Sequence, residues 1–215
     1  MRLTHWVLFF SILILSVTGY YIGHPFISIP GPAKEHFVMG TMRAIHLYTA
    51  SVFSLAVLIR IYWMFAGNRY AGLSELLPLS GERWRNLWDS LLFFCFIRRD
   101  PALYRGHDAL AGATYGVLFL IYLILIVTGL SLYTAVASAD SPFQVFAFLA
   151  PWFGGLQMAR LIHHLCMYVV LIAAVIHIYC VFLWSMVERS GEVDSIFTGY
   201  KFFPTHKAGS REQTR

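Results

Sequence analysis

The stretch Leu161–Val187 reads LIHHLCMYVVLIAAVIHIYCVFLWSMV and contains no Asp, Glu, Lys or Arg. A run of this length supplies the roughly 20 apolar residues that a helix needs to cross a bilayer. Three other runs also lack these charged residues: Leu3–Ala33, Ala44–Ile59 and Ala109–Ala139. The run Ala44–Ile59 is followed by Arg60 and then by a further uncharged stretch to Asn68. Four membrane-spanning helices are therefore expected.

The composition agrees with this expectation, because 58% of the 215 residues are hydrophobic and only 13% are charged. A soluble domain carries about 25% charged residues. We predict an all-α membrane protein, a bundle of four transmembrane helices that forms one membrane-embedded domain over residues 1–215. The helices are expected near residues 5–23, 43–66, 110–136 and 160–187.

Two shorter apolar stretches do not fit a membrane span. Leu91–Ile97 and Phe143–Phe153 are too brief to cross a bilayer, and Arg98, Pro142 and Pro151 bound or interrupt them. Segments of this kind lie at the membrane–water interface. We expect both stretches to be interfacial.

The distribution of Lys and Arg predicts the orientation, since cytoplasmic loops retain positive charge. The loop between the second and third expected helices and the C-terminal tail are rich in Arg and Lys, whereas the loop after the first helix has only Lys34. Both termini should therefore be cytoplasmic. The net charge of +5 is spread over loops that flank the membrane, so it does not indicate a nucleic-acid partner.

Four histidines within these runs are informative, because an ionisable side chain inside a membrane span is costly. With both termini inside, His5 falls near the cytoplasmic face, whereas His46 and His163 fall near the outer face. His177 follows His163 by 14 residues, about 21 Å along the helix and within about 40° of the same face. The sequence predicts two pairs at two depths, His46 with His163 and His5 with His177.

Two facing imidazoles at each depth are the axial ligands that a six-coordinate haem requires. Two haems b, an outer one on His46 and His163 and an inner one on His5 and His177, would carry electrons across the membrane. A membrane His can instead hydrogen-bond across a helix pair. His164 fits that simpler role, because it points about 100° away from His163 and has no partner at matching depth.

Each of three expected ligands follows an arginine by three residues: Arg2 precedes His5, Arg43 precedes His46, and Arg160 precedes His163. Residues i and i+3 share a helix face. These guanidinium groups could bind haem propionates or anchor the helices at lipid headgroups, and the sequence leaves both open.

A small-residue motif recurs in two of the expected helices. Thr18-Gly19 and Thr128-Gly129 stand in the similar settings Leu-Ser-Val-Thr-Gly-Tyr and Leu-Ile-Val-Thr-Gly-Leu. Small residues allow a ring or a second helix to approach closely, although helix packing alone would also explain them.

Cysteine motifs do not indicate a metal or covalent haem site. Cys95, Cys166 and Cys180 lack paired spacing, and the chain has no Cys-x-x-Cys-His. The missing Cys-x-x-Cys-His motif excludes covalent haem attachment, and the lack of paired spacing disfavours a zinc site. The three thiols are expected in the protein core.

Several motifs resemble the b-type cytochrome subunits of membrane-bound nickel-iron hydrogenases. Arg2-Leu3-Thr4-His5-Trp6 is similar to that family's opening Arg-x-x-His-Trp, and Arg43-Ala44-Ile45-His46 to its second-helix motif. Gly106-His107-Asp108-Ala109-Leu110-Ala111 resembles Gly-His-Asn-Pro-Leu-Ala, with Asp and Ala in place of Asn and Pro. His163 and His177 keep the family's spacing.

The resemblance implies an electron-transfer subunit with no hydrogen-activating site of its own, in the bacterial inner membrane. It would accept electrons from the iron-sulfur small subunit, and through it from the large subunit, of a nickel-iron hydrogenase. The outer haem would receive them and the inner haem would reduce a membrane quinone. By analogy with related four-helix cytochromes, His177, His107 and Asp108 are candidates for the quinone site, while His107 could equally cap the start of the third helix.

Other functions share the same plan. The chain could be the cytochrome b subunit of another respiratory enzyme, of the formate dehydrogenase or thiosulfate reductase type, or a stand-alone cytochrome b561. A membrane anchor without haem is the alternative from a different class. It predicts a colourless protein whose function survives loss of the four histidines.

Overall fold

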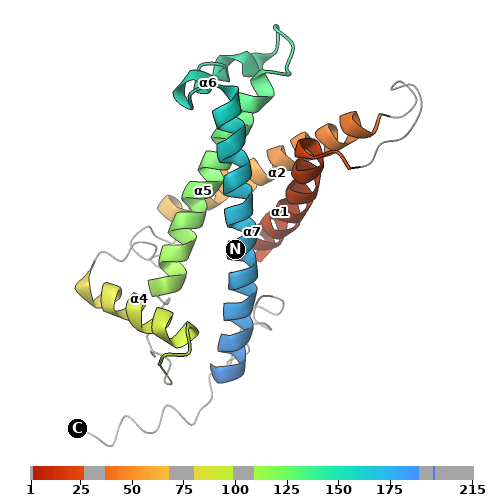
Figure 1. Ribbon diagram of the computed structural model, residues 1–215. Coiled ribbons are helices and arrows are strands. Elements are labelled where there is room, and N and C mark those ends of the chain that lie inside the picture. Colours follow the sequence, from red (N-terminus) through yellow and green to blue (C-terminus); the bar gives the residue numbers. More distant parts are fainter. Residues whose placement is uncertain (1, 27–36, 68–79, 99–108, 189–195, 197–215) are drawn as a thin grey trace, which may run out of the picture. The chain divides into compact units, whose positions relative to one another are not determined.

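The computed structural model describes residues 2–26, 37–67, 80–98, 109–188 and 196, and within these it is helical without any strand. Figure 1 shows the path of the chain. The elements in order are α1 (Arg2–Gly23), α2 (Val38–Ala66), α4 (Gly81–Phe94), α5 (Ala109–Thr134), the 3₁₀ turn η2 (Pro142–Phe146), α6 (Leu149–Trp152) and α7 (Leu156–Glu188).

The four expected membrane spans are confirmed by length and apolar composition. They are Arg2–Gly23, Val38–Ala66, Ala109–Thr134 and Leu156–Leu183. Two helices begin earlier than the apolar runs suggested, α2 at Val38 and α7 at Leu156. The start of α7 is set by Gly154 and Gly155, whose φ angles of 80° and 100° lie in a region that glycine enters without steric cost.

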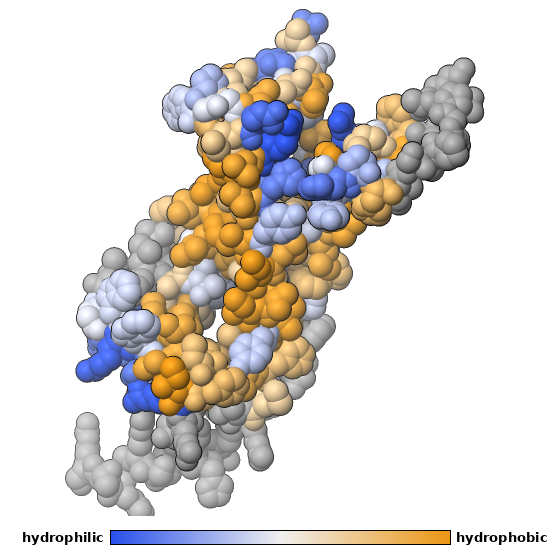
Figure 2. Space-filling view, viewed as in Figure 1, coloured by the Kyte–Doolittle hydropathy of each residue, from blue (hydrophilic) through white to orange (hydrophobic). Residues whose placement is uncertain are grey.

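The helices expose their apolar side chains rather than bury them. Only 6% to 17% of the most apolar window of each span is buried within the protein. Much of the visible surface along the helices is accordingly apolar (Figure 2). A soluble protein does not leave so much contiguous apolar surface uncovered, so this surface suits contact with lipid.

Backbone contacts divide the chain into two parts, residues 3–168 and residues 1–2 with 169–215, and each is described by itself. The first part contains α1 to α6 and the beginning of α7. Within it, α2 packs against α5. The contact includes an edge-to-face pair of Phe53 and Tyr122 with ring centroids 5.2 Å apart, and the guanidinium carbon of Arg60 lies 5.8 Å from the centre of the Phe119 ring.

The connection from α5 to α7 turns back over the end of α5. Both η2 and α6 contact α5, and Figure 1 shows α6 at the upper end of α5. The side-chain amide of Gln144 donates to the carbonyls of Thr134 at 3.0 Å and Ala137 at 3.2 Å. It thereby satisfies acceptors that the end of a helix leaves without an intrahelical partner.

The expected interfacial stretch at Leu91–Ile97 proves to be the end of a longer helix. α4 begins at Gly81, after Ser80, whose hydroxyl accepts from the Arg83 amide at 3.3 Å, a typical N-cap. α4 packs on α5 and buries Phe93 and Ser90 within the described part of the chain. Trp84 and Trp88, one turn apart, are 59% and 62% exposed. Exposed tryptophans at this spacing are typical of an interfacial helix.

Candidate functional site

His46 in α2 is held by a threonine of α1. Its Nδ1 lies 2.9 Å from Oγ1 of Thr18. The Thr18 hydroxyl is itself buried, with 4% of the residue exposed, and it lies 2.7 Å from the carbonyl oxygen of Ile14 in the preceding turn. The contact leaves the other ring nitrogen of His46, Nε2, available to a ligand.

His163 in α7 is held in the same way by a threonine of α5. Its Nδ1 lies 2.9 Å from Oγ1 of Thr128. That hydroxyl lies 2.6 Å from the carbonyl oxygen of Ile124, and Thr128 is 0% exposed. The two imidazoles therefore have the same partner type, on the same ring nitrogen, at the same distance.

The glycine after each threonine lets the imidazole approach the helix. A Cβ on Gly19 would lie 3.1 Å from Cε1 of His46, and a Cβ on Gly129 would lie 3.3 Å from Cε1 of His163. Both distances are tighter than ordinary van der Waals contact. The recurring Thr-Gly pair thus has a role in this site: the threonine contacts the ring nitrogen and the glycine makes room for the ring.

The beginning of α7 also contacts α1. A Cβ on Gly23 would meet Nε2 of His164 at 2.8 Å, and one on Gly19 would lie 3.9 Å from Sδ of Met167. Nδ1 of His164 is 2.9 Å from the carbonyl of Arg160 in its own helix. This agrees with the expectation that His164 is a hydrogen-bonding residue at a helix interface.

The other expected ligands lie in different surroundings. His5 is half-buried in α1, and its ring meets Trp6 edge-on at 5.6 Å between centroids. His177 lies in α7 and is exposed in the part of the chain from residue 169 onward. The pairing of His5 with His177 stays a prediction, and His107 and Asp108 lie outside the described residues.

The three arginines that precede expected ligands are all exposed. Arg2 is the first residue of α1, Arg43 lies in the first half of α2, and Arg160 lies in α7. Nη1 of Arg160 donates to Oε1 of Gln157 at 2.9 Å. Their role as propionate ligands stays a prediction.

The three thiols form no disulfide within the described part of the chain. Cys166 and Cys180 are partly buried in α7, but Cys95 is exposed at the end of α4. The expectation of a core position was therefore wrong for Cys95, because the residue follows the last turn of an interfacial helix.

The donor set suits a haem rather than a bare metal ion. No group of three or more His, Cys, Asp or Glu side chains gathers in the described part of the chain. A haem brings four nitrogens of its own and needs only axial ligands from the protein. His46 and His163 fit that need, because each ring is anchored through Nδ1 beside a glycine cradle and keeps Nε2 for coordination.

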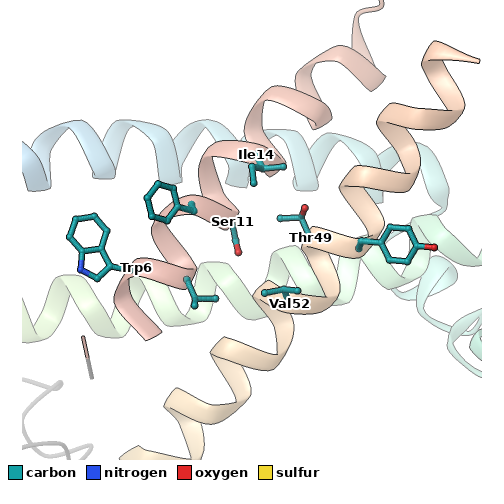
Figure 3. Close-up of a pocket in the computed structure, with 8 residues that line it drawn as sticks. Trp6, Ser11, Ile14, Thr49 and Val52 are labelled. Atoms are coloured by element: carbon teal, nitrogen blue, oxygen red, sulfur yellow. The ribbon is translucent and has the colours of Figure 1, made fainter. Parts of the chain in front are cut away.

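An open groove of about 420 Å³ lies between α1 and α2, and its lining residues Ile14 and Thr49 are about one helical turn from Thr18 and His46. Figure 3 shows Ser11 and Ile14 of α1 and Thr49 and Val52 of α2 around it. The rest of the lining is mainly apolar or aromatic, and Ser11 is 4% exposed. The groove therefore opens between the two helices that carry Thr18 and His46, without being lined by either residue.

A buried serine in α5 lies one turn beyond Thr128. Ser131 is 0% exposed, and its hydroxyl finds no hydrogen-bond partner among the described residues. A buried hydroxyl without a partner costs free energy. The sequence pattern did not draw attention to this residue, since a single serine in an apolar helix is common.

Comparison with known proteins supports the cofactor assignment. A sequence model of the family described as "Prokaryotic cytochrome b561" matches residues 1–199. The chain is 33% identical over 205 residues to a probable Ni/Fe-hydrogenase B-type cytochrome subunit of Rhizobium leguminosarum bv. viciae, and the match covers 94% of this chain and 86% of that protein. It is 32% identical over 206 residues to the Azotobacter vinelandii protein of the same description, with 94% and 86% covered.

A more distant relative matches over an even larger share. The probable Ni/Fe-hydrogenase 1 B-type cytochrome subunit of Escherichia coli strain K12 is 29% identical over 217 residues, with 99% of this chain and 92% of that protein covered. These matches confirm the resemblance seen in the sequence motifs. The chain belongs to the prokaryotic cytochrome b561 family of haem b proteins, and along most of its length it is similar to the B-type cytochrome subunits of nickel-iron hydrogenases.

Proposed function

We propose that this chain is the membrane electron-transfer subunit of a nickel-iron hydrogenase complex. It accepts electrons from the iron-sulfur small subunit and delivers them, by way of two haems b, to membrane quinone. The relatives named as hydrogenase B-type cytochrome subunits support the partner. The single observation that carries the proposal is the pair of threonine-anchored imidazoles, His46 and His163, in a chain with four apolar helices.

The haem supplies reversible one-electron transfer between ferric and ferrous iron. The chain's own residues hold it and exclude other chemistry. His46 and His163 offer neutral Nε2 atoms on the outer site, and His5 with His177 form the inner site in this proposal. Two imidazole ligands for each haem would leave no open coordination position for oxygen chemistry.

The orientation is part of the proposal and rests on the charges of the sequence. Arg and Lys concentrate in the loop that includes α4 and in the C-terminal tail, which assigns these segments and both termini to the cytoplasm. His46 and His163 then lie toward the outer face of the inner membrane. The hydrogenase small subunit would dock at that face, and quinone would bind near the cytoplasmic side.

The test is an optical difference spectrum of membranes that contain the complex. Hydrogen should reduce b-type haem and an added oxidised quinone should reoxidise it. If only dithionite reduces the haem, the chain is a cytochrome with another donor, such as a formate dehydrogenase or thiosulfate reductase type of enzyme. If no reductant yields a b-type spectrum, the chain is a haem-free anchor and the proposal is wrong.

Variants assign the ligands in the same assay. His46→Ala and His163→Ala should each remove the outer haem and stop reduction by hydrogen. His164→Ala is the matched control, because this neighbouring imidazole bonds its own helix through Nδ1 and should leave the haem in place. Loss of haem in His164→Ala with retention in His163→Ala would reverse the assignment on α7.

The quinone site is tested separately. His107→Ala should slow quinone reduction by hydrogen without changing the haem spectrum, if His107 contacts quinone. Normal quinol formation in this variant would remove His107 from the proposed site. The two-haem assignment would stand in either case, since it depends on other residues.

A further inference from the structure

We propose that Thr18 and Thr128 are a matched pair of positioning residues for the outer haem. Each accepts a hydrogen bond from the Nδ1–H of a ligand imidazole, fixes its tautomer, and leaves the Nε2 lone pair for iron. The inference rests on the proposed haem function of His46 and His163. It adds two residues whose proposed chemical role is exerted through the ligand imidazoles that they contact.

The direction of each hydrogen bond follows from proton count. A threonine hydroxyl has a single proton, whereas a backbone carbonyl oxygen only accepts. Thr18 Oγ1 lies 2.7 Å from the Ile14 carbonyl and Thr128 Oγ1 lies 2.6 Å from the Ile124 carbonyl, so each hydroxyl donates into its own helix. Toward the imidazole, Oγ1 must therefore accept, and Nδ1 must carry the proton.

The consequence for the ligand follows from imidazole chemistry. A neutral imidazole that is protonated at Nδ1 has its lone pair on Nε2. An acceptor at Nδ1–H also orients the ring and raises the basicity of the ligating nitrogen. The hydroxyl thus does more than fill space: it decides which nitrogen binds iron and how strongly that nitrogen donates.

Backbone bonding by itself is not evidence for this role. Ser and Thr side chains in helices commonly bond the carbonyl four residues earlier. Thr114 does so to Leu110 at 2.8 Å, and its hydroxyl has no hydrogen bond to a histidine among the described residues. What distinguishes Thr18 and Thr128 is the second contact, to a ring nitrogen at 2.9 Å in both cases. Both hydroxyls are shielded, with 4% and 0% of the residues exposed, so water does not compete for the bond.

The two contacts occur in equivalent places, which argues against coincidence. In each contact, the threonine of a Val-Thr-Gly sequence near the end of one span meets a histidine near the start of another span. Each of these histidines follows an arginine by three residues. Each glycine lies against the same ring edge, since Cε1 is 3.1 Å and 3.3 Å from the position that a Cβ on the glycine would take. The sequence shows that the Val-Thr-Gly motif occurs twice, and the structure shows that the threonine of each copy contacts a histidine.

The test replaces each hydroxyl by a methyl group in the full complex. Thr18→Val and Thr128→Val keep the shape and remove the acceptor. Because the ligand then loses basicity, ferric haem is less stabilised, and the midpoint potential of one haem should shift in the positive direction. Haem affinity should fall by about 10–100-fold, as for other partners of metal-ligating histidines. Potentiometric titration of the optical spectrum and the haem-to-protein ratio measure these effects.

Two controls separate the hydroxyl from other effects. Thr114→Val removes an equivalent bond within a helix and should leave potential and haem content unchanged. Thr18→Ser and Thr128→Ser retain a hydroxyl and should behave as the unaltered protein. If the valine variants match Thr114→Val, or if the serine variants are as impaired as the valine variants, the positioning role is wrong.

The unaltered protein provides a test that does not depend on the folding of variants. Pulsed electron paramagnetic resonance of the ferric outer haem should detect an exchangeable proton on the non-ligating nitrogen of both axial imidazoles. The absence of that proton from either ring would overturn the inference. Failure to find any b-type haem in the unaltered chain would instead refute the proposed function, so the two failures are distinguishable.

Discussion

The contact between α1 and α2 and the contact between α5 and α7 use the same residues in different surroundings. Both pair a Thr-Gly with a histidine at 2.9 Å. Thr18 is 4% exposed, and an open groove of about 420 Å³ lies between α1 and α2 about one turn away from it, whereas on α5 both Thr128 and Ser131 are 0% exposed. A local hydrogen-bond arrangement can thus recur while the enclosure around it differs, and enclosure decides how costly each change should be.

The largest loss of haem should come from replacement of the histidines themselves. This loss should be the same for the α1–α2 contact and the α5–α7 contact. On the proposed ligation, His46→Ala and His163→Ala should each abolish haem binding at this site, because each variant would leave the haem with one protein ligand. The double variant should be no worse than either single one, since residues that act as a unit are not additive. The haem-to-protein ratio measures this.

A double variant with markedly less haem than either single variant would contradict the shared site. It would mean that His46 and His163 serve separate groups. The comparison of the two contacts would then describe two sites rather than two halves of one.

Replacement of the glycines should separate the two contacts. Gly19→Ala brings a methyl 3.1 Å from His46 and near Met167, whereas Gly129→Ala brings one 3.3 Å from His163. Overpacking costs about 1–3 kcal/mol, and alanine regains about 1 kcal/mol of helix propensity. We expect Gly19→Ala to lower the thermal midpoint in detergent more than Gly129→Ala does.

Gly81→Ala is the control for the glycine series, because in the described part of the chain no atom beyond its neighbours and its own helix backbone lies within 4 Å of the added methyl group. It should leave the haem spectrum unchanged and should not lower the thermal midpoint. Equal loss at Gly19 and Gly129 would show that the extra contact to Met167 has no energetic weight.

Ser131→Ala tests the energetic effect of the buried hydroxyl that lies one turn beyond Thr128 in α5. Removal of a buried hydroxyl that has no partner among the described residues should stabilise the protein by about 1 kcal/mol. Ser54→Ala is the control, because its hydroxyl donates to the Ala50 carbonyl at 2.7 Å and its loss should not stabilise. A destabilised Ser131→Ala would reveal a partner of that hydroxyl in the assembled cytochrome.

The smallest effect should come from the arginines that precede the two histidines. Arg43 and Arg160 are exposed, and Arg160 bonds Gln157 of its own helix. Surface changes of this kind stay within about 0.5 kcal/mol, so Arg43→Gln and Arg160→Gln should keep the haem content and thermal midpoint. A loss of haem in either variant would favour a propionate contact over headgroup anchoring.

The spans were predictable because membrane insertion depends on local composition. A helix that crosses a bilayer forms all its backbone hydrogen bonds within itself, so it needs only a sufficiently long apolar run. Leu161–Val187 is such a run. The sequence predicted only the apolar end of α4, as an interfacial stretch. The first turns of this helix contain charged residues such as Glu82, Arg83 and Arg85, so they do not form an apolar run. Its N-cap at Ser80 and its packing on α5 define the helix.

The candidate ligands were likewise visible in the sequence, since a histidine in an apolar run is rare and costly. Sequence could also show that Thr-Gly occurs twice, but it offered close packing as a sufficient reason. It did not indicate that each threonine meets a histidine, because 28 residues separate Thr18 from His46 and 35 separate Thr128 from His163.

The sequence by itself thus determined the membrane-spanning helices, the family and the candidate haem ligands, all of which depend on residue type and spacing along one chain segment. Only the tertiary structure decided which helix faces which and brought each hydroxyl to a ring nitrogen. Side-chain hydrogen bonds act over about 3 Å, so they depend on helix pairing and rotation, which local composition does not specify.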